Sequence, residues 1–137
     1  MKKGGFFVPK PGDTFTTTLK RAHLEWGSHR HTNTRGTVYG EGYLHIPRQE
    51  AMSLGIYNSN CSGANIIYTC NSADGFLQNA SLKASGCSTA GDIYAKQFQG
   101  NGNLQLIGQW FRHVNAQVGD QVKITWISQT EIEIELI

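Results

Sequence analysis

Hydrophobic and polar residues alternate along several short segments of the chain, and this period of two predicts β-strands. The clearest case is the C-terminal stretch, where Ile132, Ile134 and Leu136 alternate with glutamates. Alternation or a high content of β-branched residues predicts strands over residues 14–19, 37–46, 64–70, 92–98, 104–107, 121–128 and 131–137. The last two strands are expected to form a hairpin around Gln129 and Thr130.

Breaks in this alternation mark helices and turns. Residues 48–54 follow Pro47 and precede Gly55, which is typical of a short helix. Residues 108–114 are expected to form a second short helix or a turn, and residues 73–88 are ambiguous, with a hairpin around Asp74 and Gly75 as one reading. The pattern therefore predicts a mainly β protein, a barrel or sandwich of about seven strands with two short helices.

Length and composition narrow the class. A chain of 137 residues with 39% hydrophobic residues suits a single domain over residues 1–137 with one core. It has no apolar run of about 18 residues and no visible signal peptide, so we expect a cytoplasmic protein without a membrane partner. Cys61, Cys70 and Cys87 are odd in number and irregularly spaced, which favours buried free thiols over disulfides or a zinc site.

Charge is unevenly distributed. Most of the 12 Lys and Arg residues, and all histidines but one, lie before residue 49, whereas the chain ends with Glu131, Glu133 and Glu135. This polarity suits a polyanion bound to one face, and it suits an ordinary solvated surface equally well.

The basic segment 28–35 carries the most suggestive chemistry. Arginine makes forked hydrogen bonds to guanine or phosphate, asparagine pairs with adenine edges, and threonine binds phosphate oxygens. His29 and His31 could instead bind a metal with His113 or a cysteine, although Arg30 between them disfavours a cation. The carboxylate and lysine set of metal nucleases is missing, so we expect no catalytic site and no cofactor.

Three segments, in order, resemble the B3 family of DNA-binding domains. Residues 15–19 read Phe-Thr-Thr-Thr-Leu, as in the family's first strand, which often reads Phe-x-Lys-x-Leu-Thr. Residues 42–48 read Gly-Tyr-Leu-His-Ile-Pro-Arg and precede Ala51, and residues 118–122 read Val-Gly-Asp-Gln-Val. They resemble the family's Arg-Leu-x-Ile-Pro-Lys-x-x-Ala passage and its Gly-Asp-x-Val turn. The long basic insertion 22–42 is similar to the target-recognition domains of bacterial restriction endonucleases.

This resemblance implies a seven-stranded open pseudobarrel that grips the major groove of double-stranded DNA with two arm loops. The first arm would be residues 23–35, and the second would be residues 96–101 or, in reserve, residues 79–88. A partner nuclease domain or subunit, in a bacterial cytoplasm, would do the cutting. The expected base contacts are Arg30, Asn33, Gln97 and Gln99; the expected phosphate contacts are Lys20, Arg21, Arg35, Lys83 and Lys96; His31 suits either, and His23 and Asn101 complete the arms.

A carbohydrate-binding or other ligand-binding β-sandwich is the alternative function. Trp26, Trp110, Trp126 and the five tyrosines could stack on sugar rings. Aromatic residues in small barrels more often belong to the core, so their exposure decides between the two readings.

Overall fold

The protein forms one seven-stranded sheet that curls into a nearly closed barrel. The computed structural model describes residues 8–21, 42–61, 63–86 and 92–137. The strand order around the sheet is β1-β6-β7-β3-β4-β5-β2, and neighbouring strands are antiparallel except for the parallel pair β3–β7. The strands are β1 (Thr14–Thr18), β2 (Leu44–His45), β3 (Ile67–Ser72), β4 (Ala80–Ser85), β5 (Gln97–Gly100), β6 (Gln121–Ser128) and β7 (Glu131–Leu136).

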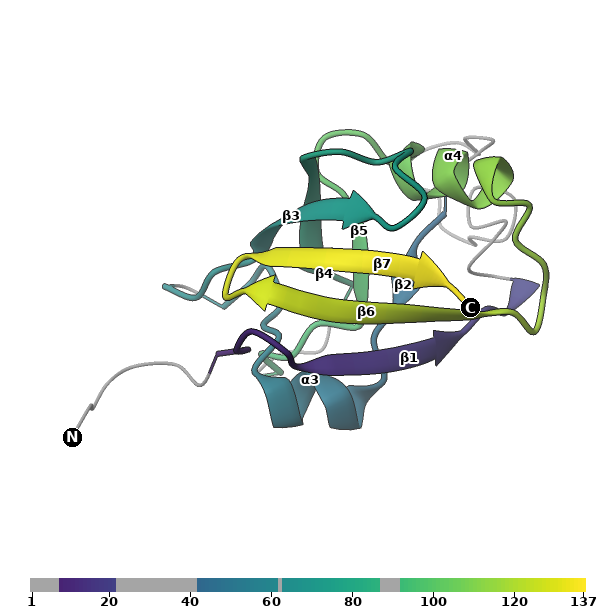
Figure 1. The fold of residues 1–137 in the computed structure, drawn as a ribbon. Coiled ribbons are helices and arrows are strands. Elements are labelled where there is room, and N and C mark those ends of the chain that lie inside the picture. Colours follow the sequence, from purple (N-terminus) through teal and green to yellow (C-terminus); the bar gives the residue numbers. More distant parts are fainter. Residues whose placement is uncertain (1–7, 22–41, 62, 87–91) are drawn as a thin grey trace.

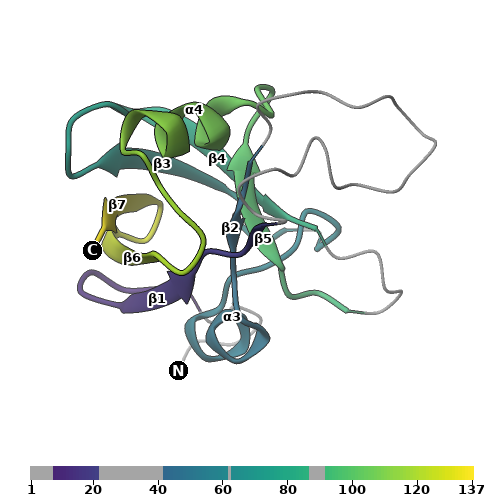
Figure 2. The same cartoon turned by 90° about the vertical axis from the view of Figure 1, so that its right-hand side faces the viewer.

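Two short helices accompany the barrel within the described residues. Helix α3 (Arg48–Leu54) and helix α4 (Leu106–His113) lie on opposite sides of it (Figures 1 and 2). The expected fold class, a mainly β pseudobarrel with two short helices, is therefore confirmed. Neither helix is long and apolar enough to cross a membrane.

The best-patterned elements fall where the sequence predicts them. Strands β1, β6 and β7 and helix α3 match their predicted ranges to within a residue, and α3 ends at Gly55. Strand β3 begins three residues later than expected, and β4 lies in the ambiguous segment 73–88. Of the predicted strand 37–46, residues 37–41 lie outside the described residues, and only Leu44–His45 pair.

The predicted strand 104–107 is wrong, and the predicted strand 92–98 is right only for Gln97 and Phe98, which begin β5. Residues 104–107 lead into helix α4, because Ile107, Trp110 and Phe111 recur at helical spacing and all three are buried. Residues 92–96 lie before β5, and only Tyr94 makes a bridge, to Tyr57. Backbone hydrogen bonds flank this bridge, from the Asn58 N–H to the Ile93 carbonyl and from the Ala95 N–H to the Ile56 carbonyl, while an Asp92 carboxylate oxygen accepts the Tyr94 N–H at 3.1 Å.

Inward-facing residues of the strands form one core. Aromatic rings from four strands meet in it: the centroid of Trp126 on β6 lies 6.0 Å from Phe15 on β1, 6.1 Å from Tyr68 on β3 and 6.2 Å from Phe98 on β5. Cys61 and Cys70 are buried free thiols, as expected, whereas Cys87 lies outside the described residues. Burial raises the pKa of Cys70 to about 12.

The turn between β3 and β4 is fastened to α4 by one carboxylate. Trp110 is fully buried and donates its indole N–H to Asp74 Oδ2 at 2.8 Å. Asp74 Oδ1 accepts the backbone N–H of Phe76 at 2.9 Å and the hydroxyl of Ser72 at 3.1 Å. His113 stacks on Phe76 with ring centroids 4.3 Å apart. One acid thus orders the turn and holds it against the helix.

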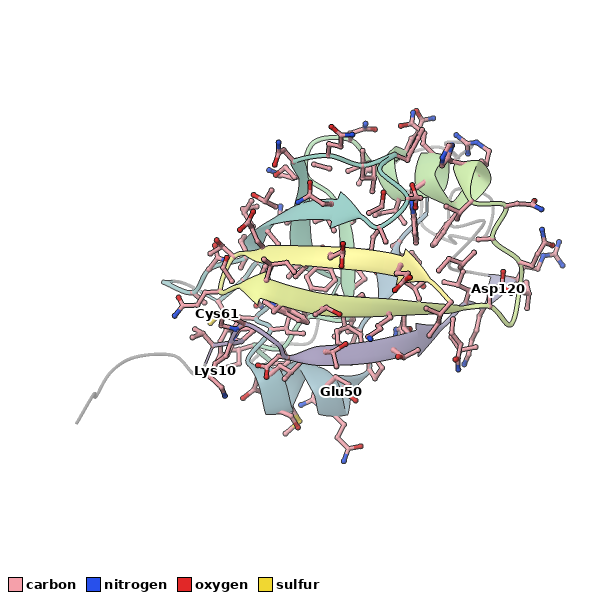
Figure 3. All side chains as sticks on the ribbon, in the orientation of Figure 1. Lys10, Glu50, Cys61 and Asp120 are labelled. Carbon is pink, nitrogen blue, oxygen red and sulfur yellow. The ribbon has the colours of Figure 1, made fainter. Side chains whose placement is uncertain are left out.

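In the turns at the two ends of the β1–β6 pair, an aspartate side chain likewise accepts a backbone N–H. Asp13 accepts the backbone N–H of Lys10 at 2.8 Å just before β1, and Asp120 accepts that of Gln117 at 2.9 Å just before β6. Because the two strands are antiparallel, Lys10 and Asp120 lie at opposite ends of the barrel (Figure 3).

Candidate nucleic-acid interface

Outward-facing residues of three adjacent strands make a compact polar surface. In the register, Gln97 of β5 lies between His45 of β2 and Ser85 of β4, and Gln99 lies opposite Lys83. Their strand neighbours Leu44, Leu82 and Phe98 are buried on the other side of the sheet. We call this surface the β2–β5–β4 face; it consists of His45, Lys83, Ser85, Gln97 and Gln99.

The two glutamines on this face are joined by a hydrogen bond. Gln97 Nε2 donates to Gln99 Oε1 at 2.8 Å. Both side chains are partly exposed, whereas Ser85 is only 7% exposed and its hydroxyl has no hydrogen-bond partner within the described chain. Buried hydroxyls are normally paired, so this one is an exception; its oxygen is shielded from solvent beside Gln97.

Cations border the face. Lys20 and Arg21 are exposed at the end of β1, and Lys96 is exposed just before β5, where its carbonyl accepts the N–H of Ile46. Burial lowers the pKa of His45 from 6.5, and the nearby charge of Lys20 lowers it further, while a hydrogen bond to the Lys96 backbone opposes both. His45 is therefore mostly neutral at pH 7, and Lys20 lies close enough to act on it.

Acidic residues lie on a different part of the barrel. Glu131, Glu133 and Glu135 point outward from β7, which β3 and β4 separate from β5. Lys123 of β6 is paired in register with Glu135. Strand β3 therefore lies between the row of glutamates on β7 and the β2–β5–β4 face. A polyanion bound to that face would lie on a different part of the barrel from these glutamates.

The structure brings together six of the predicted contact residues and leaves others unplaced. Lys83, Gln97 and Gln99 belong to the face, and Lys20, Arg21 and Lys96 border it. Asn101 follows β5 and instead binds Ser81, with its Nδ2 at 3.1 Å from the hydroxyl. The whole predicted first arm, residues 23–35, lies outside the described residues, and with it the predicted contacts His23, Arg30, His31, Asn33 and Arg35.

The second arm is not the loop that the sequence suggested. Most of residues 96–101 form strand β5, and most of residues 79–88 form strand β4. Both segments nevertheless contribute to one surface, because β4 and β5 pair. Sequence reasoning missed His45 and Ser85; alternation with buried Leu44 and Ile46 could have placed His45 outward, but nothing local shows that β2 pairs with β5.

Other candidate sites are weaker. Trp110 and Trp126 are buried in the core and cannot stack on a sugar, and Trp26 lies outside the described residues. Within the described ranges no group of three or more His, Cys, Asp and Glu could hold a metal ion. His29 and His31 fall outside those ranges.

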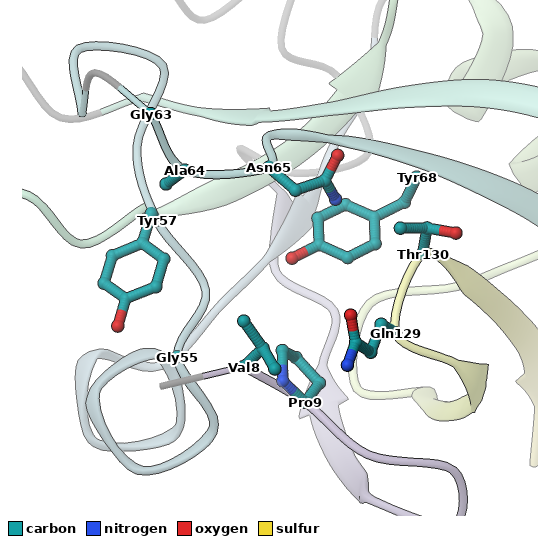
Figure 4. Close-up of a pocket in the computed structure, with 10 residues that line it drawn as sticks. All are labelled: Val8, Pro9, Gly55, Tyr57, Gly63, Ala64, Asn65, Tyr68, Gln129 and Thr130. Atoms are coloured by element: carbon teal, nitrogen blue, oxygen red, sulfur yellow. The ribbon is translucent and has the colours of Figure 1, made fainter. Parts of the chain in front are cut away.

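One cavity of about 140 Å³ lies beside the β6–β7 turn, where Tyr68 and Asn65 approach Gln129 and Thr130 (Figure 4). Burial raises the pKa of Tyr68 to about 12, so its phenol stays protonated at neutral pH. The phenol is therefore a hydrogen-bonding group there and neither a base nor a nucleophile.

No protein-family model matches the chain, and no curated protein matches its sequence. Function is therefore inferred from the chemistry of the β2–β5–β4 face and its border.

Proposed function

We propose that the protein binds double-stranded DNA in a sequence-dependent way through the β2–β5–β4 face. The observation that carries this proposal is the pairing of β4 with β5, which places Lys83 opposite Gln99 and beside Gln97. Amide side chains discriminate between base edges, and lysines neutralise phosphates. The face therefore combines a group for selectivity with a group for affinity.

Cations at the border supply the remaining affinity in this proposal. Lys20 and Lys96 both lie near His45, and with the neighbouring exposed Arg21 they would contact phosphates beside the groove. The major groove is about 12 Å wide, and in this proposal the side chains that project from β4 and β5, two inner strands of the sheet, reach the base edges in it. His45 adds little charge to the face, because burial and the charge of Lys20 lower its pKa.

The resemblance to B3 domains leads to the same proposal in a narrower form. The chain would be the target-recognition part of a restriction endonuclease, and a separate nuclease domain or subunit would cut the DNA. The composition of the β2–β5–β4 face supports a role in DNA recognition, because its five residues include two amides and a lysine and no carboxylate.

Selection from a randomised duplex pool at two salt concentrations tests the proposal. We expect enrichment of a short motif and an affinity that falls as salt rises. Lys83→Ala and Lys96→Ala should each weaken binding and reduce the slope of log K against log salt by about one.

Lys123→Ala is the matched control, because Lys123 is an outward lysine on the acidic side of the barrel. Its affinity for the selected duplex should stay close to wild type. The proposal would be contradicted if the protein retained no duplex even at low salt. It would also be contradicted if the three lysine variants lost the same amount of affinity.

A further inference from the structure

The hydrogen bond between Gln97 and Gln99 fixes the orientation of both amides. Gln97 Nε2 donates to Gln99 Oε1 at 2.8 Å, and the two residues share one side of β5. An amide oxygen has two lone pairs and an amide nitrogen has two N–H groups. Gln99 therefore keeps one acceptor position and its donors for an external partner, side by side.

Gln97 is itself held in place by Gly86. This glycine has φ +100, and a Cβ built on it would lie 2.9 Å from Gln97 Cγ and 3.0 Å from Gln97 Oε1. The Gln97 side chain thus lies directly over the backbone of Gly86, which supports it on one side, and a larger residue at 86 would displace it. Of the two amides, Gln97 is the support and Gln99 is the one that can present its groups.

The residues opposite the pair leave the Gln99 amide as the partly exposed group that offers both a donor and an acceptor. Ser85, opposite Gln97 in the register, is buried and has an unpaired hydroxyl within the described chain. Lys83, opposite Gln99, brings donors and no acceptor. A ligand edge that offers both a donor and an acceptor would therefore match the Gln99 amide.

We propose that Gln99 reads an adenine in the major groove and that Gln97 is its positioning residue. This inference rests on the proposed DNA-binding function. Adenine presents an N6 donor next to an N7 acceptor, which matches the oxygen and nitrogen of one amide. Guanine presents two acceptors, and its O6 would face the Gln99 oxygen; thymine presents O4 and a methyl group. Only adenine offers the complementary pair of groups.

Selection from a randomised duplex pool with the whole chain tests this reading. The wild type should enrich a motif with an invariant A·T pair. Gln99→Met should lose the preference for A·T at that position and keep the rest of the motif. It should bind the selected A·T duplex about 5- to 150-fold more weakly than the wild type does. Gln97→Met, which keeps the packing against Gly86 but cannot donate, should relax the same position to a smaller degree.

Gln109→Met is the control, because Gln109 is an exposed glutamine on α4 and its replacement should leave the whole motif unchanged. Melting temperatures close to wild type should show that the variants fold. A second measurement needs no variant: 7-deazaadenine at the invariant position removes the N7 acceptor and should weaken wild-type binding by at least about fivefold.

The outcomes separate the two proposals. A motif without an invariant A·T pair, or one that neither Gln99→Met nor the loss of N7 affects, overturns adenine reading and leaves DNA binding in place. Retention of no duplex at low salt overturns both.

Discussion

Replacing Asp74 with alanine should detach the β3–β4 turn from helix α4 and lower stability measurably. The change removes the acceptor of the Trp110 indole N–H, a bond of 2.8 Å, and leaves that fully buried donor unpaired. An unsatisfied buried donor costs about 1–3 kcal/mol. Loss of the 2.9 Å bond from the Phe76 N–H adds a smaller amount because it lies near solvent. We expect a loss of about 2–3 kcal/mol in the free energy of unfolding and a fall in Tm of roughly 6–10 °C.

Urea denaturation followed by circular dichroism measures this loss, and a double-mutant cycle isolates its cause. Trp110→Phe removes the donor, so Asp74→Ala should cost about 1 kcal/mol less in that background than in the wild type. A single-variant cost below about 0.5 kcal/mol, or the same cost in both backgrounds, would refute the reasoning.

The pH dependence of stability provides an independent check on Asp74. Burial by itself raises its pKa, but hydrogen bonds from Trp110, Phe76 and Ser72 outweigh burial and hold the pKa below 3.8. A carboxyl whose pKa is lower in the folded state stabilises the protein fully above its unfolded pKa. This contribution should therefore be complete above pH 3.8 and be lost as the pH falls below it, and Asp74→Ala should lack that part of the acid dependence.

Three further predictions concern separate features. Gly100→Ala should destabilise the protein by about 3 kcal/mol or more in urea denaturation, because a Cβ there would overlap the carbonyl oxygen of Asn103; a variant as stable as wild type would contradict this. NMR titration should give His45 a pKa below 6.5 that rises in Lys20→Ala, and an unchanged value would show that Lys20 does not act on it. Cys70 is fully buried with a pKa of about 12, so iodoacetamide at pH 8 should leave it unmodified in the native protein and alkylate it after unfolding, as read by mass spectrometry; rapid native labelling would contradict this burial.

Local periodicity predicted the elements whose pattern is strong. Ile132 and Ile134 alternate with glutamates over a whole strand, so the inward face of β7 could be predicted without knowing its neighbours. Proline and glycine bracket helix α3, which fixed its ends. Elements with weak patterns were missed: β4 reads Ala-Ser-Leu-Lys-Ala-Ser, and its small residues give little contrast between its two faces.

The candidate site divides in the same way. The resemblance to B3 domains selected Lys83, Gln97 and Gln99 as contact residues, and their amide and ammonium groups suit DNA wherever they lie. It placed them in arm loops, whereas Lys83 lies in β4 and both glutamines lie in β5. Alternation had predicted a strand as far as Phe98, but β5 has four residues and carries too short a periodic signal for its ends to be predicted.

The sequence by itself determined which side chains face inward or outward along each well-patterned strand, and which chemistries the outward ones carry. Only the tertiary structure decided which strands are neighbours. Pairing joins β2 to β5 and β5 to β4 across long stretches of chain, and it is set by burial of a shared core that local pattern does not encode. That pairing places His45 and Ser85 on either side of Gln97, and so creates the β2–β5–β4 face on which the proposed function rests.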